Sequence, residues 1–342
     1  MKNLVLLLIV IFCLSGVKAQ DVHFSQMRFS PFTLNPALAG MGGDYQAIVN
    51  YRSQWNSVAA PFTTIGASYD MRFGNNNTNG GFLAGGLNFF HDVAGDMRMT
   101  TSNVNLNIAY HLAVNRESTI GAAIQVGYAQ RGLGTPDGNW ESQYSNGSFD
   151  NNLSSNESFG EMSFGHLDAG AGFVYNYDSR NKGSFSSDGL LLTAGLSAFH
   201  LNRPEYSFIV GGEDDLHMRY AGFIQSEFML SDSKWALMPA LYYQKQGGHQ
   251  EIFGGTYFKY LVSSGSQRTG FVQNFSIAYG AFYRFGDAFV NKLLLEFSDY
   301  SLGIAYDFNV SSLTQASNGR GGIEFMLRYS MKNNSRSRAR IN

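Results

Sequence analysis

The sequence has 342 residues, of which 15% are charged and 15% are aromatic, and its formal net charge is −2. Soluble domains carry about 25% charged residues, while the mean hydropathy of −0.17 is too low for a bundle of membrane-spanning helices. The net charge argues against a nucleic-acid partner, because binding to the phosphate backbone requires a basic face. Low charge, many aromatic residues and 39 glycines are typical of a transmembrane β-barrel. A pair of soluble β-sandwiches is the alternative.

Residues 1–19 have the features of a cleaved signal peptide. Lys2 supplies the positive start, and a site of small residues ends at Ala19. The apolar stretch between them, residues 4–14, is well short of the ~20 residues that a spanning helix needs. Phe12 precedes Cys13 where a lipidation signal requires a small residue. Because Cys13 is the only cysteine, the mature chain is expected to contain no disulfide, thiolate nucleophile or cysteine metal ligand.

The next segment, residues 20–44, shows no regular alternation of apolar and polar residues. Asn35 and Pro36 favour a turn that opens a short helix, and Gly40 ends that helix. A segment this apolar in front of the first strand is expected to pack against another part of the protein. Two arrangements fit the sequence equally well: a plug inside a barrel, or a cap at the periplasmic rim.

From Tyr45 onward, apolar and polar residues alternate in short segments separated by turn residues, which predicts strands with one apolar face. The clearest is residues 103–112, where three asparagines on one face (Asn103, Asn105 and Asn107) suit a water-filled lumen better than a protein core. About fourteen segments follow this pattern: 45–52, 64–73, 82–90, 103–112, 120–128, 167–177, 190–199, 216–230, 235–243, 252–262, 275–283, 288–297, 300–308 and 322–330. The sequence therefore predicts an all-β fold, a transmembrane antiparallel barrel of about 14 strands over residues 45–331.

The connections between these segments suggest an orientation in the membrane. With a periplasmic start, the odd-numbered connections face outward, and they include the long stretches 132–165, 201–215 and 310–320. The inward connections include the short stretches 113–118 and 231–233, in keeping with bacterial outer-membrane barrels. Residues 332–342 carry four basic side chains without periodicity, which indicates a basic periplasmic tail. A docking arm for an acidic partner is the alternative.

No motif for catalysis or for a cofactor is found in the sequence. The seven histidines are scattered, and neither a nucleophile elbow nor a phosphate-binding loop is present. The acidic run 213–215 is interpreted as a solvated loop, with calcium binding as a less favoured alternative. We therefore expect a protein that is not an enzyme and that uses neither a cofactor nor a metal.

Several parts of the chain resemble the PorP/SprF family of type IX secretion outer-membrane proteins. The resemblance begins with residues 20–40, in which QD, FSQ, SP and LNPALAG recur in that order. It continues through Arg52, Gln54 and Trp55, through residues 61–70 and through residues 195–204. At the end of the chain it includes residues 303–313 and Glu324, so that it spans nearly the whole mature sequence.

The resemblance implies an outer-membrane barrel that serves the type IX secretion and gliding machinery of Bacteroidetes-type bacteria. The partners implied are the periplasmic ring proteins of the secretion complex, a large secreted adhesin client, or both, together with outer-membrane lipid. Asn35, Pro36, Gln54 and Trp55 are the candidate partner-binding residues that the resemblance provides. The main alternative is a transporter of apolar solutes similar to the FadL barrels. The inward positions are interpreted as small or polar, mostly Asn, Gln, Ser and Gly. An open diffusion pore is disfavoured because it would need a charged constriction, and the transporter is disfavoured because it would need an apolar pocket in the lumen.

Overall fold

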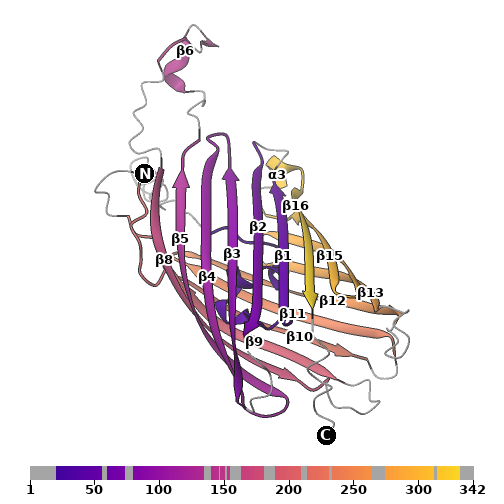
Figure 1. The fold of residues 1–342 in the computed structure, drawn as a ribbon. Coiled ribbons are helices and arrows are strands. Elements are labelled where there is room, and N and C mark those ends of the chain that lie inside the picture. Colours follow the sequence, from indigo (N-terminus) through magenta and orange to yellow (C-terminus); the bar gives the residue numbers. More distant parts are fainter. Residues whose placement is uncertain are drawn as a thin grey trace, which may run out of the picture.

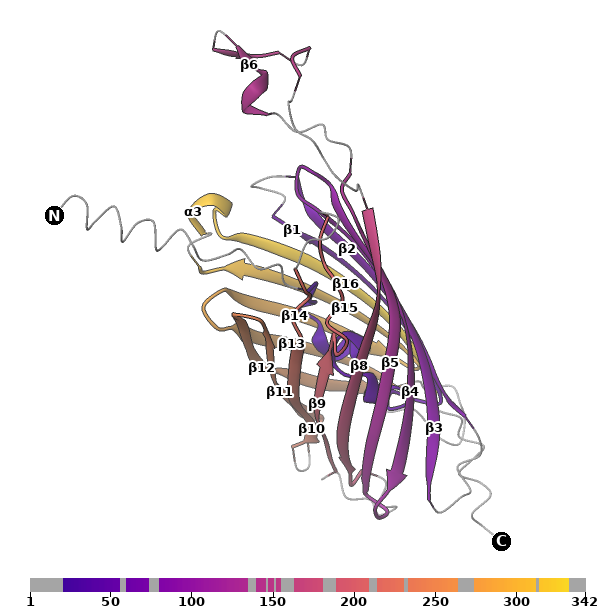
Figure 2. The same ribbon diagram turned by 90° about the vertical axis from the view of Figure 1, so that its left-hand side faces the viewer.

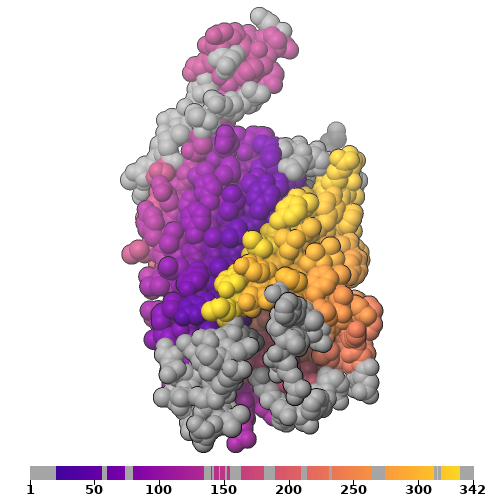
Figure 3. Space-filling view, turned by 45° about the vertical axis from the view of Figure 1, so that its right-hand side comes forward, coloured from indigo at the N-terminus to yellow at the C-terminus, as the bar shows by residue number. Residues whose placement is uncertain are grey.

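The computed structural model describes residues 21–55, 60–73, 80–134, 140–145, 147–150, 152–154, 163–180, 189–208, 214–230, 233–263, 274–311 and 314–331. These residues form a closed antiparallel barrel of 14 strands (Figure 1). Each strand pairs with its neighbours in the chain, and β1 closes the barrel on β16 in the register Tyr45↔Met331 to Gln54↔Gly322. In Figure 3 this closure appears as a continuous seam between the first and last strands. The predicted signal peptide and basic tail lie outside the described residues, as does Glu213 of the acidic run.

The fourteen predicted segments correspond one by one to the barrel strands, which confirms the fold class. The strands are β1 (Tyr45–Gln54), β2 (Phe62–Phe73), β3 (Gly81–Ala94), β4 (Met99–Ala113), β5 (Ser118–Gly132), β8 (Ser163–Asp178), β9 (Leu190–Phe199), β10 (Arg219–Met229), β11 (Trp235–Gln246), β12 (His249–Ser263), β13 (Phe275–Arg284), β14 (Ala288–Phe297), β15 (Tyr300–Asn309) and β16 (Arg320–Met331). A small hairpin of β6 (Tyr144–Ser145) and β7 (Ser148–Phe149) follows η3 (Glu141–Gln143) in the long connection after β5. The helix α3 (Thr314–Ser317) lies between β15 and β16.

Alternation along each strand separates an apolar outer face from the lumen. On β4, Val104 and Ile108 are 52% and 45% exposed, whereas the intervening Asn105 and Asn107 are buried. The outward residues suit contact with lipid, because a barrel in a membrane presents an apolar band to the hydrocarbon. Among the described residues, no helix combines the length and the apolar character that crossing a membrane requires.

The barrel has two distinct ends, which fix the positions of all the side chains discussed below. We call the end where β1 finishes and β2 begins the loop end. The opposite end, where β1 begins and β16 finishes, is the turn end. The described parts of the long connections 133–162 and 200–218 and the helix α3 lie at the loop end, as Figure 1 shows for α3 and β6. Short connections such as 114–117 and 298–299 lie at the turn end.

The segment 21–44 lies inside the barrel, so the structure has the plug arrangement of the two that the sequence left open (Figure 2). Three short helical elements form it: η1 (Met27–Phe29), α2 (Pro31–Leu34) and η2 (Pro36–Leu38). As the sequence indicated, Asn35 caps η2, because its side chain accepts a hydrogen bond from the Ala37 N–H, and Pro36 follows at the first helical position. We call residues 21–44 the plug.

The plug runs the length of the lumen from the loop end to the turn end. Its first described residue, Asp21, contacts His200 and Gln246, both at the loop end of the wall. Its last part contacts Asp70, near the turn end of β2, through the Gly40 N–H. β1 begins at the turn end, whereas the first described residue of the plug lies at the loop end. The periplasmic side of the barrel stays a prediction. The plug itself enters from the loop end, a course that strand alternation could not reveal.

Candidate functional site inside the barrel

The wall of the barrel is shaped to receive individual plug residues. Glycines lie at several close approaches of the plug to the wall: a Cβ atom on Gly86 of β3 would collide with the ring of Phe32, and one on Gly303 of β15 would collide with Gln26. Glycine is the residue that permits such close approach. The plug is therefore packed into the wall at defined positions and does not fill the lumen loosely.

Asn35 occupies the most specific of these positions. Its Nδ2 donates hydrogen bonds to the backbone carbonyls of Phe173 on β8 and Leu196 on β9, at 3.0 and 2.9 Å. Gly172 and Gly195 flank the amide on these strands, and a Cβ atom on either would come too close to it. Asn35 and Pro36 are buried, so the structure gives this candidate pair contacts within the protein. Whether either residue also binds a partner stays a prediction.

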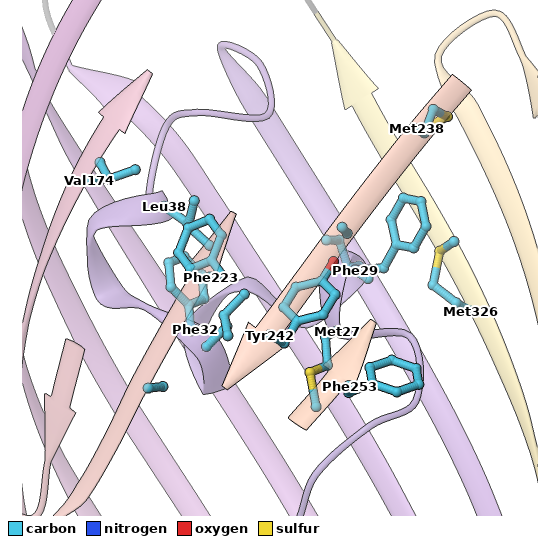
Figure 4. Packing of buried hydrophobic residues seen from close by; sticks show 14 of the residues in the cluster. Met27, Phe29, Phe32, Leu38, Val174, Phe223, Met238, Tyr242, Phe253 and Met326 are labelled. Atoms are coloured by element: carbon cyan, nitrogen blue, oxygen red, sulfur yellow. The ribbon is translucent and has the colours of Figure 1, made fainter. Parts of the chain in front are cut away.

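An apolar cluster joins the plug to the wall. Met27, Phe29, Phe32 and Leu38 of the plug pack among inward-facing side chains of the strands, which include Val174, Phe199, Phe223, Met238, Tyr242, Phe253, Tyr257, Phe282 and Met326. Figure 4 shows members of both sets grouped inside the barrel. The expectation of small or polar inward positions is therefore wrong for this region, where large aromatic side chains face the lumen and the plug covers them.

The most buried polar contacts surround Ser25, and we call this group the anchor cluster. Arg52 on β1 forms ion pairs with Asp307 on β15 and Glu324 on β16, at 3.1 and 3.2 Å. The Ser25 hydroxyl lies 2.8 Å from Asp307 and accepts hydrogen bonds from Arg52 and from Arg284, at 2.7 and 2.8 Å. Glu324 in turn accepts hydrogen bonds from the N–H groups of Ser25 and Gln26, at 2.7 and 3.0 Å. Ser25 and Gln26 of the plug are thus held by charged side chains from four strands.

A buried lysine completes the anchor cluster. Lys292 Nζ donates to the Ser25 carbonyl at 2.7 Å and lies 3.7 Å from the centroid of the Phe282 ring. The cluster therefore combines charge-assisted hydrogen bonds with a cation–π contact. Removing one partner from a buried ion pair costs about 3–5 kcal/mol, because the remaining charge is left uncompensated. Strong attachment of the plug follows from this arrangement.

Further charges line the lumen toward the turn end. Lys259 on β12 bridges Glu227 on β10 and Glu296 on β14, at 2.9 and 2.6 Å, and Arg328 on β16 contacts Glu296 at 3.2 Å. The expectation that inward positions are mostly Asn, Gln, Ser and Gly is therefore wrong. The lumen is rich in charge, but the charges are paired with one another and with the plug.

A second polar group holds the first described residue of the plug at the loop end. The imidazole of His200 lies between two carboxylates, 2.7 Å from Asp21 and 2.9 Å from Asp168, and Arg219 lies 2.8 Å from Asp21. Burial disfavours the charged imidazole, but the two carboxylates outweigh it and raise the pKa of His200 to about 9. Burial likewise opposes ionisation of Asp21, but His200 and Arg219 lower its pKa well below the usual range. This group is called the latch.

A third contact involves His23, between the latch and the anchor cluster. Its Nε2 lies 3.4 Å from Glu251 at the start of β12. Glu251 favours the charged imidazole, but burial and the nearby Arg284 prevail and lower the pKa of His23 to about 4. At neutral pH His23 is therefore uncharged and His200 is charged, although both residues join the plug to the wall at the loop end.

The other two candidate partner-binding residues lie at the rim of the loop end. Trp55 has a positive φ of 57°, and its ring packs edge-to-face on Phe62, with centroids 4.7 Å apart. Gln54 lies against Arg52. In the amide orientation that places the Gln54 oxygen toward the guanidinium, this oxygen accepts a hydrogen bond from Arg52 Nη2 at 2.6 Å. These two positions are separate from the enclosed Asn35 and Pro36, and partner contact at Gln54 and Trp55 stays a prediction. The matching stretches of the resemblance include Ser25 and His200, but neither of these, nor Arg284 or Lys292, is among the candidate partner-binding residues.

Comparisons with known proteins agree with the barrel. The profile of the family described as “Type IX secretion system membrane protein PorP/SprF” matches residues 16–329. Among solved structures, the “TodX deltaS2S3 mutant monoaromatic hydrocarbon channel” is similar in fold, with a TM-score of 0.50 and 10% identity over 87% of this chain and 93% of that chain. A FadL homologue from Pseudomonas aeruginosa has a TM-score of 0.44 and 12% identity over 86% of this chain and 92% of that chain. Among curated proteins, a search finds no significant match.

Proposed function

Because the chain belongs to the PorP/SprF family of type IX secretion system membrane proteins, we propose that it is a plugged barrel that binds proteins and carries no solute. Its role as an outer-membrane component of type IX secretion follows from the family. The proposal concerns the task within that system: supporting export or surface anchoring of a secreted adhesin-like client, docking to the periplasmic secretion ring, or both. The role is non-catalytic.

The observation that carries the proposal is the way the plug is held. Seven side chains of the anchor cluster and the latch hold Ser25 and Asp21 in the loop half of the lumen (Arg52, Arg284, Lys292, Asp307, Glu324, His200 and Arg219). Asn35 and His111 fix the other half through backbone carbonyls of the wall and of Ala39. A solute path through the lumen would require breaking these buried contacts, whereas a protein partner can use the rim and the outer loops with the plug in place.

Surfaces for such a partner are available at the loop end. The β6–β7 hairpin presents Tyr144 and Phe149, which are 57% and 37% exposed. Trp55 stands at the rim on Phe62. Aromatic side chains of this kind supply much of the binding energy in protein interfaces. The combination favours contact with a polypeptide outside the lumen.

The alternative is a transporter similar to the FadL barrels, and the likeness to a monoaromatic hydrocarbon channel supports it at the level of the fold only. The size of the cavities argues against it. Three cavities inside the described barrel measure about 50, 30 and 20 Å³, whereas an apolar cavity that binds benzene measures roughly 150 Å³. The largest also carries polar side chains such as Asn103, Asn105 and Asp168.

Deletion of the gene distinguishes the two functions. We expect a specific large surface protein to remain inside the deletion strain, with growth on apolar nutrients unchanged. Normal export of all surface proteins, combined with lost uptake of an apolar nutrient, would establish the transporter instead.

A substitution then tests the rim. Trp55→Ala is expected to lower recovery of the client in a pull-down of the tagged barrel, with the amount of barrel in the outer membrane unchanged. Trp235→Ala is the matched control, because Trp235 packs on Tyr260 with centroids 4.9 Å apart but stands at the turn end. Equal loss of client in both variants would exclude the rim as the contact.

A further inference from the structure

A cavity of about 50 Å³ lies beside the latch in the loop half of the lumen. The plug contributes Asp21 and Phe32 to its lining, and β4, β5 and β8 contribute Asn103, Ala129 and His166. A water-sized group needs ~10–15 Å³ on this measure. The cavity therefore has room for about three to five heavy atoms, which excludes a sugar ring or a nucleotide.

The shape of the cavity follows from the register of three neighbouring strands. Asn103 on β4 is paired with Ala129 on β5, and Ala129 is paired with His166 on β8. The small side chain of Ala129 thus lies between two larger polar ones in a single row across the lumen wall. The adjacent row repeats the arrangement, with Gly127 between Asn105 and Asp168. The small residues Ala129 and Gly127 of β5 therefore leave a hollow lined by polar side chains of β4 and β8.

Four polar atoms in the lining have no hydrogen-bond partner among the described residues. One of them, Nε of Arg219, is ion-paired with Asp21 at 2.8 Å, and three remain. They are Oδ1 of Asn103, Oδ1 of Asn105 and Nδ1 of His166. Both asparagines are more than nine-tenths buried, with exposed fractions of 7% and 4%. A buried polar atom without a partner costs about 1–3 kcal/mol, so each of these atoms favours a ligand that satisfies it.

Each of the three unpartnered atoms can accept a hydrogen bond. An amide oxygen accepts hydrogen bonds only, and Nδ1 of His166 accepts in the tautomer that carries its proton on Nε2. A primary ammonium group offers three N–H donors and no acceptor, and it therefore matches a set of three acceptors. A hydroxyl group supplies one donor and would leave two of the three unsatisfied.

The charged side chains that line the cavity are paired with one another. Asp21 and Asp168 are balanced by His200 and Arg219 within the latch. Phe90 also lines the cavity, and the face of an aromatic ring attracts cations within about 6 Å. An added anion would meet three unpartnered acceptors, while the donors of His200 and Arg219 are already paired, so the lining disfavours it.

We infer that this cavity binds a primary alkylammonium group. If the barrel serves a protein client, as proposed above, the group is the side chain of a client lysine that enters from the loop end; a free amine is the other source. The inference rests on the proposed function only for the identity of the source. The site itself stands on the lining of the cavity.

Calorimetric titration of the purified full-length barrel with n-butylammonium tests the site without any client. We expect saturable binding of one equivalent. Tetramethylammonium, which has the charge but no N–H donor, and 1-butanol, which has one donor and no charge, are expected to bind at least about tenfold more weakly. Absence of saturable binding by n-butylammonium, or equal binding of all three compounds, would overturn the inference.

Two variants locate the binding. The double substitution Asn103→Leu and Asn105→Leu removes two acceptors, and Ala129→Leu fills the hollow while retaining them; each is expected to weaken n-butylammonium by about tenfold or more. Asn176→Leu is the matched control, because Asn176 faces the lumen on β8 near the turn end and is bonded to Thr193. Unchanged affinity in both Ala129→Leu and the double variant would place the binding elsewhere and overturn the site.

Competition between n-butylammonium and a bound client then identifies the source of the ammonium group. If n-butylammonium releases the client from the immobilised barrel, the group is a client lysine, and if the client stays bound, the group is a free amine. Both results retain the ammonium site. A barrel that binds n-butylammonium but never recovers a client would contradict the proposed function alone, and the two failures are therefore distinguishable.

Discussion

Arg52 on β1 and Asp307 on β15 form an ion pair of 3.1 Å across the intervening strand β16, and the hydroxyl of Ser25 contacts both side chains. The pair lies next to the seam where β1 closes the barrel on β16. It therefore links closure of the barrel to the position of the plug, because the Arg52 guanidinium contacts both Asp307 of the wall and Ser25 of the plug.

Arg52→Ala is expected to destabilise the folded barrel by about 3–5 kcal/mol, because Asp307 and Glu324 lose a buried partner. Urea unfolding in lipid vesicles measures this loss, and proteolysis is expected to cut residues 21–44 faster in the variant. Arg180→Ala is the control: its pairs with Asp178 and Glu227 are 34% exposed on the arginine side, which corresponds to about 0–1 kcal/mol. Equal stability of Arg52→Ala and the wild type would contradict a structural anchor.

The latch gives a pH dependence whose sign follows from His200. Its pKa in the folded state, about 9, is above the ordinary value of 6.5. A raised folded pKa means that the charged contact stabilises the plug fully below pH 6.5, and that this stabilisation is lost as the pH rises through 9. We expect the start of the plug to loosen between pH 8 and 10, a range that follows from the pKa of about 9.

Labelling of Val22→Cys with a maleimide measures this loosening, because the only natural cysteine, Cys13, lies in the predicted signal peptide. Thiolate formation raises the rate with pH in any background, so the same substitution combined with His200→Gln is the control. The ratio of rates between the two backgrounds is expected to approach one as the pH rises to 10. A ratio that stays constant from pH 7 to 10 would exclude His200 as the titrating group.

Much of the barrel could be predicted from the sequence because its signal is local. A period of two places Val104 outside and Asn105 inside whatever the rest of the chain does, and the turn at Asn35–Pro36 is also set by adjacent residues. The fourteen strands follow from such patterns.

The interior could not be predicted in this way, because its contacts join distant residues. Arg52 and Asp307 are 255 positions apart, and a strand pattern shows only that each points inward. The plug has no periodicity that indicates its course, and the water-filled lumen inferred from the three asparagines is wrong at Asn107. That residue is fully enclosed and is bonded to Gln125 and Asn88. In the sequence, residues of opposite charge at inward strand positions are the signal that indicates a filled lumen.

The outer face of β4 allows a test of lipid contact. Ile108→Arg is expected to destabilise the barrel by about 2–4 kcal/mol, because the charge enters the hydrocarbon near the midplane. Val114→Arg, just beyond the turn end of β4 and 58% exposed, is expected to cost about 0–1 kcal/mol, since the penalty falls near the interface. Unfolding in vesicles compares the two, and similar losses would mean that β4 does not cross the bilayer at this depth.

The orientation of the barrel in the outer membrane is tested by placing tags at its two ends. The β6–β7 hairpin belongs to the longest described connection, at the loop end, whereas β16 finishes at the turn end. Because long connections face outward in bacterial barrels, a tag inserted after Ser154 is expected to bind antibody on whole cells. A tag after Asn342 is expected to bind only after the outer membrane is permeabilised. With this orientation the loop end faces outward, so that Trp55, the latch and the ammonium site face the cell exterior. Antibody binding to the C-terminal tag on intact cells would reverse the orientation and place those same residues toward the periplasmic ring.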